Sequence, residues 1–197
     1  MATQFSMLGI INAALISQGM DEVPVGVDTP EYRVLTQNWP TIVEAELEDG
    51  NYSFTKKQAT LLTRSAGLYG YDDSFAVPNA ALHVRHLWIE APEGRREIQW
   101  VQDGTHVHVN NPSGCIIEYL EVADPSLWSA NFSRAVQYRL EAVLLRAVKE
   151  EANEALAMEQ QAEVYFQRAR TNSSKSRSAV PPMKPSRIAL ARFGRGT

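Results

Sequence analysis

The stretch that decides the fold is DPSLWSANFSRAVQYRLEAVLLRAV, residues 124–148. Its apolar residues recur every three or four positions, the spacing that lines one side of an α-helix; they are Trp128, Phe132, Ala135, Val136, Leu140, Val143, Leu144 and Val148. Polar residues take much of the opposite side, namely Arg134, Gln137, Arg139, Glu141 and Arg146. The pattern predicts a helix that is half covered and lies at the edge of a core.

Length and composition favour one soluble domain. The chain has 197 residues, 44% of them hydrophobic, which is enough for one domain with a substantial core. It has no apolar run of the roughly 18–20 residues that a membrane-spanning helix needs, and no secretion signal is evident. We therefore expect no contact with a membrane and no secretion. The single cysteine, Cys115, precedes two isoleucines, which predicts a buried thiol on a strand.

Charge is distributed unevenly along the chain. The segment from residue 172 onward contains no acidic residue and carries +6, while the whole chain carries −4, so the remainder carries −10. This asymmetry predicts that residues 173–197 form a separate basic tail that seeks an acidic partner. Its Ser, Pro, Arg and Lys composition is typical of a segment that orders only on binding.

Two helices are predicted before residue 50. The first covers about residues 4–18 and ends at Gly19, where a helix C-terminus favours glycine. The second covers about residues 30–48, with Asp28 or Thr29 as its cap and Pro30 in its first turn. Pro40 either kinks this second helix or makes it restart.

Alternating patterns predict a β insertion over about residues 52–122. Leu82, Val84, His86 and Trp88 are expected to share one face of a strand. A hairpin turn is predicted at Asp103-Gly104, followed by a strand through Val107 and then by the strand CIIEYLEV. These strands are expected to form a small antiparallel meander.

A third helical region is predicted over about residues 129–170. A bend near residues 149–152 would divide it into two helices, but no glycine or proline enforces the bend, so both alternatives stay open. The expected fold is therefore α+β and mainly α, an antiparallel helical bundle with an inserted β-meander and an extended C-terminal tail. The expected boundary between the domain, residues 1–172, and the tail, residues 173–197, follows the change in composition.

Catalytic patterns are weak in this sequence. His106 and His108 lie two apart on a predicted strand and so share a face, as two metal ligands should, whereas His83 and His86 are expected on opposite faces. There is no nucleophile elbow, phosphate-binding loop or H-E-x-x-H helix. We expect no enzyme activity and no cofactor. A small metal-dependent enzyme using His106 and His108, or a non-specific DNA-binding module, are the alternatives.

Two passages resemble a known family. The first begins with Val77-Pro78 and continues with Leu82, Val84 and Trp88 before the hairpin; the second comprises Tyr119, Val122, Asp124, Pro125, Trp128, Phe132 and Ala135. Together with the order of the elements over residues 6–170, these passages resemble the head-to-tail adaptors of tailed bacteriophages, of the tail tubular protein A type. The sequence departs from the family pattern at Val77, where leucine is usual, and at Pro40.

The resemblance implies a structural virion protein. Adaptors of this family form a twelve-membered ring beneath the portal, and the genome passes non-specifically through its centre. The implied partners are the portal protein, further copies of the chain and the next tail protein, a nozzle or tail-tube protein. The implied location is the head–tail junction of the virion, with assembly in the host cytoplasm.

Two sets of residues are predicted to make these contacts. The tail is expected to bind the portal through Lys175, Arg177, Lys184, Arg187, Ile188, Leu190, Arg192, Phe193 and Arg195. The polar side of the 124–148 helix is the expected contact between subunits, through Arg134, Arg139, Glu141 and Arg146.

Overall fold

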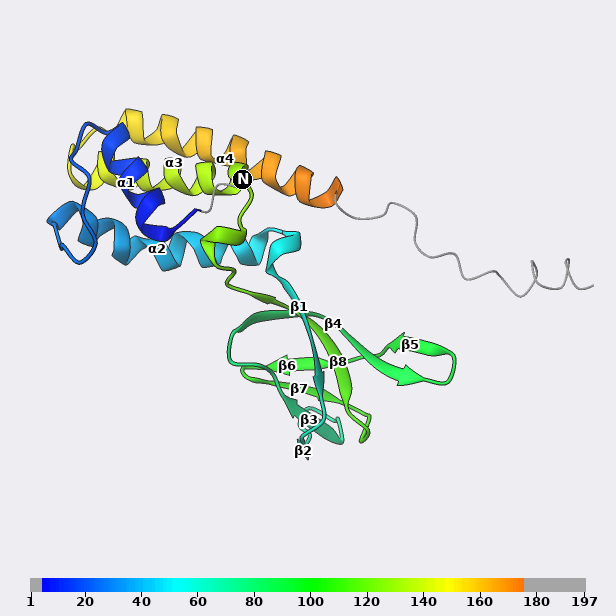
Figure 1. Cartoon of the computed structure of the whole chain (residues 1–197). Helices are drawn as coiled ribbons and strands as arrows, with labels where there is room; N and C mark the ends of the chain where they lie inside the picture. The colour runs from blue at the N-terminus through cyan, green and yellow to red at the C-terminus, as the bar shows by residue number, and fades with distance from the viewer. Residues whose placement is uncertain (1–4, 176–197) are drawn as a thin grey trace, which may run out of the picture.

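The computed structural model describes residues 5–175, and the helices and strands in it form two units (Figure 1). The helical unit consists of α1 (Met7–Ser17), α2 (Pro30–Asp49), α3 (Ala130–Ala147) and α4 (Ala152–Lys175). The β unit lies between α2 and α3 in the sequence and consists of β1 (Lys56–Leu61), β2 (Arg64–Ala66), β3 (Asp73–Ala76), β4 (Ala81–Ala91), β5 (Gly94–Glu97), β6 (Val101–Asp103), β7 (His106–Val109) and β8 (Cys115–Glu121). Two short 3-10 helices, η1 (Ser53–Thr55) and η2 (Pro125–Leu127), connect the units. The α+β class expected from the sequence is confirmed.

The helix starts are set by side chains that cap them. Ser6, Thr29 and Ser129 each accept a hydrogen bond from a backbone N–H in the first turn of α1, α2 and α3, respectively. Pro40 does not end α2, which is continuous from Pro30 to Asp49. Leu35, Val43 and Leu47, which flank the proline in the sequence, are all buried, so packing against the core holds both halves in one helix. None of the described helices is long and apolar enough to cross a membrane.

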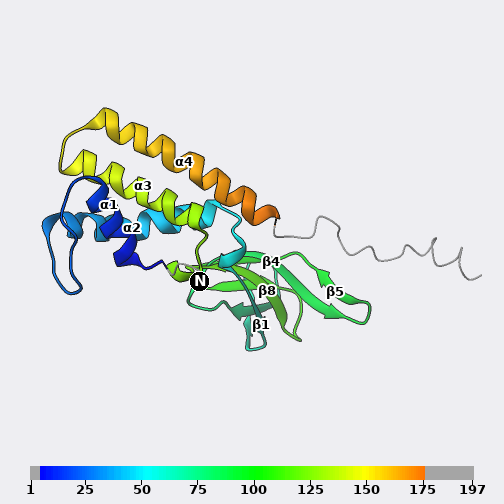
Figure 2. The same ribbon diagram turned by 45° about the horizontal axis from the view of Figure 1, so that its top comes forward.

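Helix α3 is the central helix of the bundle, and its predicted position at the edge of the core is wrong. It contacts α1, α2 and α4, and Figure 2 shows these helices gathered around it. Ser133, Gln137 and Glu141 lie on its polar side and are all buried. The reason is α1, which covers this side: the Gln137 side chain donates a hydrogen bond to the Ala13 carbonyl over 3.3 Å.

A bend separates α3 from α4, which settles the alternative that the sequence left open. Glu150 takes a left-handed conformation, with φ of 56°, although neither glycine nor proline is present. Lys149 donates from its Nζ to the Gln18 carbonyl over 2.9 Å, which ties the bend to the end of α1. The two helices therefore form a hairpin (Figure 2).

The β insertion consists of two four-stranded antiparallel sheets, with the orders β1-β8-β4-β5 and β2-β3-β7-β6. The hairpin at Asp103-Gly104 is confirmed, because β6 pairs with β7 around it. The predicted simple meander is not found, since β8 pairs with β4 on one side and with β1 on the other. Alternation of apolar residues marks strands but carries no information on which distant strands pair. A separate apolar core fills this unit, with Phe75, Val84, Leu87, Val107, Val109 and Ile117 at its centre.

Strand β4 contains a bulge that was not predicted from the sequence. Val84 lies opposite Tyr119 and Leu87 lies opposite Ile117, so the two buried residues of β4 are three apart instead of two. The extra residue reverses the alternation beyond it. His86 is therefore exposed, and it shares the face of His83, because these histidines oppose Glu118 and Leu120. The expectations that His86 shares a face with Val84 and that His83 and His86 diverge are both wrong.

Gly114 ends the turn before β8 at a position that no other residue fits well. Its φ is 95°, and a Cβ placed there would lie 2.5 Å from the Leu61 carbonyl oxygen. We expect Gly114→Ala to lower the free energy of unfolding by about 2 kcal/mol, because the new methyl group adds a backbone clash to an unfavourable φ. Chemical denaturation would measure the loss. Gly104→Ala is the matched control, since its φ is 53° but no atom lies within 4 Å of the added Cβ; an equal loss in both variants would contradict the role of the clash.

Helix α4 continues three residues past the boundary predicted at residue 172. Ser173 is buried, and its Oγ accepts a hydrogen bond from the Ser53 N–H over 2.6 Å. The last turn of α4 is thus attached to the segment that leads into β1, although its composition resembles that of the tail. The folded part of the chain includes residues 173–175.

Candidate functional site

The passage from β8 to α3 connects the β unit to the bundle through η2. Asp124 caps η2 through a hydrogen bond from the Ser126 N–H of 2.8 Å, and its hydrogen bonds with Ser126 lower the pKa of the Asp124 carboxyl. The indole of Trp128 donates to the Ala123 carbonyl over 2.9 Å and stacks on Trp39 of α2, with ring centroids 5.6 Å apart. Asp124 and Trp128 of the second family-like passage therefore order the connection between β8 and α3 and hold it against α2.

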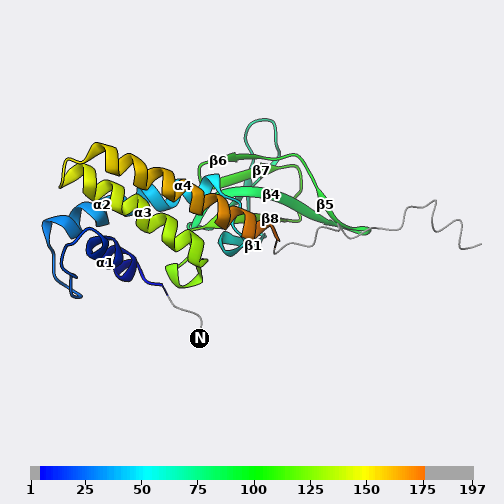
Figure 3. The same ribbon diagram turned by 90° about the horizontal axis from the view of Figure 1, so that it is seen from above.

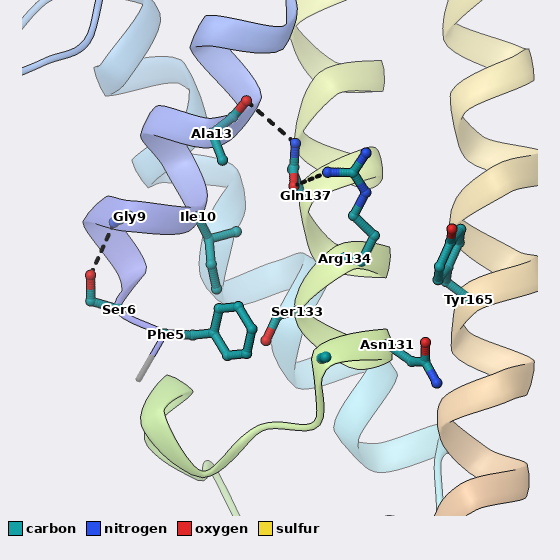
Figure 4. A pocket seen from close by; sticks show the side chains of 11 residues that line it. Phe5, Ser6, Gly9, Ile10, Ala13, Asn131, Ser133, Arg134, Gln137 and Tyr165 are labelled. Carbon is teal, nitrogen blue, oxygen red and sulfur yellow. Dashed lines mark hydrogen bonds between the residues drawn. The ribbon is translucent and has the colours of Figure 1, made fainter. Parts of the chain in front are cut away.

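A groove of about 690 Å³ opens between α1, α3 and α4 (Figure 4). The groove is lined by a mixture of apolar and polar side chains, and none of them is a carboxylate. The lining residues are Phe5, Ser6, Gly9, Ile10, Ala13, Ala130, Asn131, Ser133, Arg134, Gln137 and Tyr165. The Oγ of Ser133 is buried, and it has no hydrogen-bond partner among residues 5–175. A second, smaller hollow of about 380 Å³ shares Asn131 with the groove and is lined by Gln167, Arg168, Thr171, Asn172 and Lys175.

Arg134 is the cation of this groove. Its Nη1 donates to Gln137 Oε1 over 3.0 Å, and its Cζ lies 4.8 Å from the centre of the Tyr138 ring. The Gln137 Nε2 in turn donates to the buried Glu141 carboxylate over 2.8 Å. Arg134 therefore has neutral neighbours but no ion pair within the part of the chain that the structure describes.

The other three residues expected at a subunit contact have partners inside the chain. Glu141 is 3% exposed, so it has no surface to offer. Arg146 forms an ion pair of 2.7 Å with Glu159 of α4, and Arg139 lies 3.8 Å from Glu46 of α2. A contact role for the exposed Arg134 and Arg146 and the half-buried Arg139 stays a prediction, and we leave Glu141 out of it.

A cluster of charges joins α2 to α4 near the C-terminal ends of the two helices. Arg170 donates to Glu46 Oε2 over 3.0 Å and also lies near Glu163 and Asp49. Burial raises the pKa of the Glu46 carboxyl, and the positive charges of Arg170 and Arg139 oppose this rise. Burial also raises the pKa of the neighbouring Tyr52 to about 12. The cluster has the properties of a structural ion-pair network.

His106 and His108 lie on one face of β7, and the Nδ1 atom of each ring has a polar neighbour, whereas the Nε2 of His108 is buried and has no hydrogen-bond partner among residues 5–175. The Nδ1 of His108 accepts a hydrogen bond from the Leu68 N–H over 3.2 Å, and the Nδ1 of His106 lies 3.1 Å from the Thr105 hydroxyl. Among residues 5–175 there is no group of three or more His, Cys, Asp or Glu side chains that could hold a metal ion. The geometry gives the metal-enzyme alternative no third ligand there.

Cys115 lies on β8 and is 2% exposed, as expected for a buried strand thiol. Burial raises the pKa of this thiol to about 11, so at neutral pH it stays protonated and unreactive.

The predicted portal-binding tail lies almost wholly outside the described residues. Lys175 is its one described member and is exposed at the end of α4. The remaining members lie beyond residue 175. The groove between α1, α3 and α4 was not predicted, because Ser133, Gln137 and Glu141 at four-residue spacing look like a solvent-facing side, and the sequence gives no signal that α1 covers them.

Comparisons with known proteins add little to this geometry. No model of a protein family matches the chain, and no protein of curated function matches it. Among solved structures, the chain is similar to one titled "Neck of empty GTA particle computed with C6 symmetry", with 12% sequence identity and a TM-score of 0.25 over 100% of this chain and 96% of that chain. A TM-score this low carries no argument about fold or function.

Proposed function

We propose that this chain is a head-to-tail adaptor of a tailed bacteriophage or a related particle, a structural protein that forms a ring beneath the portal. Residues 1–175 would be the body of each subunit, and residues 176–197 would extend to the portal. The ring would link the head to the next tail protein and continue the channel through which the DNA passes.

The observation that carries the proposal is the joint at residues 119–135. This is the passage whose residue pattern resembles the adaptor family, and it connects the β unit to a bundle whose helices occur in the order that the resemblance implies. An adaptor transmits force and position between two assemblies, so its two units need a fixed relation to each other. The Trp128 hydrogen bond and the stacking on Trp39 hold the connecting segment against α2, which supports such a relation.

The charge of the chain supports a role for the tail in assembly. The end of the chain is basic while the body is strongly acidic, so the two parts are suited to different surroundings. An acidic body lets DNA pass without adhering to it, because phosphates are repelled. The basic tail, with the apolar residues Ile188, Leu190 and Phe193, would bind the portal by coupled folding and binding.

Removal of residues 176–197 is expected to abolish attachment to the portal and leave the fold intact. The deletion starts after Lys175 so that the buried Ser173 and its hydrogen bond to Ser53 are kept. The purified chain would be mixed with the portal protein of the same particle and the complex imaged by electron microscopy. Full attachment by the truncated chain would contradict the role of the tail, and rings of the intact chain on the portal would support the proposed function as a whole.

Two variants of the full chain separate the roles of apolar and basic tail residues. Replacement of Ile188, Leu190 and Phe193 by serine removes the proposed anchors, and we expect faster dissociation from the portal. Replacement of Lys184, Arg187, Arg192 and Arg195 by glutamine keeps the anchors, and we expect mainly slower association, because surface charges act on encounter. Surface plasmon resonance would resolve the two rates.

A further inference from the structure

The groove between α1, α3 and α4 and the hollow next to it form one basic surface. Neither is lined by a carboxylate, whereas Arg134, Arg168 and Lys175 all belong to their walls. None of these three cations forms an ion pair within residues 5–175. Arg168 and Arg134 instead lie over tyrosine rings, Tyr165 and Tyr138. We call this surface the basic groove.

The C-terminal half of α2 presents a surface of the opposite charge. A hollow there is lined by Ala45, Glu46, Glu48 and Asp49, so three of its four residues are acidic. Glu46 and Asp49 are near Arg170, but Glu44 and Glu48 are exposed and form no ion pair within the described chain. These two carboxylates are four residues apart and therefore lie on one face of the helix. We call Glu44, Glu48 and Asp49 the acidic edge.

The two surfaces lie on different sides of the bundle. Figure 3 shows α1, which borders the basic groove, on one side of the α3–α4 pair and the C-terminal end of α2 on the other. Complementary surfaces on opposite sides of one chain cannot meet within that chain. They can meet between copies, in a head-to-tail contact that leaves a free surface at each end and so continues until a ring closes.

We propose that the basic groove of one copy receives the acidic edge of α2 from the next copy, with Arg134 and Arg168 paired to Glu44 and Glu48. The proposal deepens the proposed ring and rests on it. It assigns one side of each subunit contact to the groove walls and the other side to α2. The pairing gives carboxylates to cations that have none within residues 5–175, and it covers the apolar floor around Ile10 and Phe5.

The chain's own tail is the other candidate occupant, and its charge argues against it. The segment from residue 172 onward carries +6 and no acidic residue, so it would be repelled by a groove that already carries Arg134 and Arg168. An acidic, exposed helix face can bind in the same groove without this charge repulsion.

Two charge-reversal variants test the contact. One is R134E/R168E, which reverses the groove, and the other is E44K/E48K, which reverses the acidic edge. Sedimentation velocity over a range of concentrations at low salt would measure self-association of the full chain. We expect each variant alone to associate at least about tenfold more weakly than the wild type, because like charges then face each other.

An equimolar mixture of the two variants is the decisive sample. In the mixture an intact groove meets an intact edge, and a reversed groove meets a reversed edge, so we expect association to return to near the wild-type level. R96E is the matched control, since Arg96 is exposed on β5, far from both surfaces in sequence and fold, and it should associate as the wild type does. The neutral variant R134Q/R168Q should show an intermediate loss of self-association. Thermal melts of all variants would show whether any loss results from misfolding instead.

Several results would overturn the proposal. These are a wild-type chain that stays monomeric at every concentration, single variants that associate normally, or a mixture that fails to recover. Loss of DNA binding in R134E/R168E with unchanged self-association would assign the groove to nucleic acid instead. If the variants still formed rings on the portal, this contact would be wrong while the proposed function stood; absence of any ring from the wild-type chain on the portal would sink the function itself.

Discussion

Phe132→Ala is expected to lower the free energy of unfolding by about 3–5 kcal/mol, the range for removal of a large buried aromatic side chain. Phe132 is fully buried and lies at the centre of a cluster of rings. Its ring makes edge-on contacts with Trp128, Tyr52, Phe54 and Phe166, at centroid distances of 4.7, 4.8, 5.4 and 5.5 Å. These neighbours come from three separate segments, around η1, after η2 and in α4, so they cannot all move inward to fill the cavity.

The loss should also affect how the β unit is joined to the bundle. Tyr52 and Phe54 begin the chain's passage into the β unit, and Trp128 ends the passage out of it, so Phe132 is in contact with both. We expect the midpoint temperature of thermal unfolding to fall by about 10 °C, since each kcal/mol of lost stability lowers this midpoint by roughly 2–4 °C in a chain of this size. Near-UV circular dichroism should lose intensity before the far-UV signal does, because the aromatic packing loosens first.

Two substitutions calibrate this expectation. Phe132→Leu keeps most of the buried volume, and we expect a loss of about 1–1.5 kcal/mol. Leu127→Ala changes a side chain that directly precedes Trp128 but is 58% exposed, and it should cost less than about 0.5 kcal/mol. If Phe132→Ala were no more harmful than Leu127→Ala, the ring cluster would not be the centre of the bundle core.

The sequence was sufficient for the elements of the bundle but not for their neighbours. The positions of α1 and α2 follow from local signals, such as the Thr29 cap and Pro30, that act within one turn. The environment of α3 does not follow from such local signals. Ser133, Gln137 and Glu141 look like a solvent-facing side in the sequence, and only the fold-back of α1 onto that side buries them and creates the groove.

The β unit shows the same limit in another form. The hairpin at Asp103-Gly104 is local and was predicted, whereas the pairing of β1 with β8 joins residues about sixty positions apart. The bulge in β4 could not be predicted either, because the residue types in a strand do not show which residue lies outside the regular pairing. It moves His86 to the exposed face and Leu87 into the core, and so changes which histidines share a surface.

Arg170→Met is expected to destabilise the chain by about 2 kcal/mol at pH 7. Arg170 donates to the Glu46 carboxylate over 3.0 Å, and the Glu46 side chain is only 13% exposed. Removing the cation leaves a largely buried carboxylate with Arg139 at 3.8 Å as its remaining cation. Loss of one partner of a fully buried pair costs about 3–5 kcal/mol, and the lower figure here reflects the partial exposure of Arg170.

The destabilisation should fade as the pH falls, and this dependence identifies Glu46 as its cause. Burial already raises the pKa of Glu46 above its ordinary value of 4.5, and Arg170 opposes that rise, so the variant should raise this pKa further. A carboxyl whose pKa is higher in the folded than in the unfolded state contributes stability that is present at low pH and is lost as the pH rises through the folded pKa. The stability of the variant depends more on protonation of Glu46 than the stability of the wild type does. The difference between variant and wild type should therefore be largest near pH 7 and shrink as the pH approaches about 4.5.

Denaturant unfolding at a series of pH values, with the wild type measured in parallel, would test this. Arg168→Met is the matched control, because Arg168 lies on the same helix over the Tyr165 ring but forms no ion pair within residues 5–175, and its small effect should not vary with pH. Glu46→Gln in the Arg170→Met background should restore part of the lost stability at pH 7, since it removes the unpaired charge. A loss in Arg170→Met that stayed constant from pH 7 to about 4.5 would instead point to the lost packing of the arginine stem between α2 and α4.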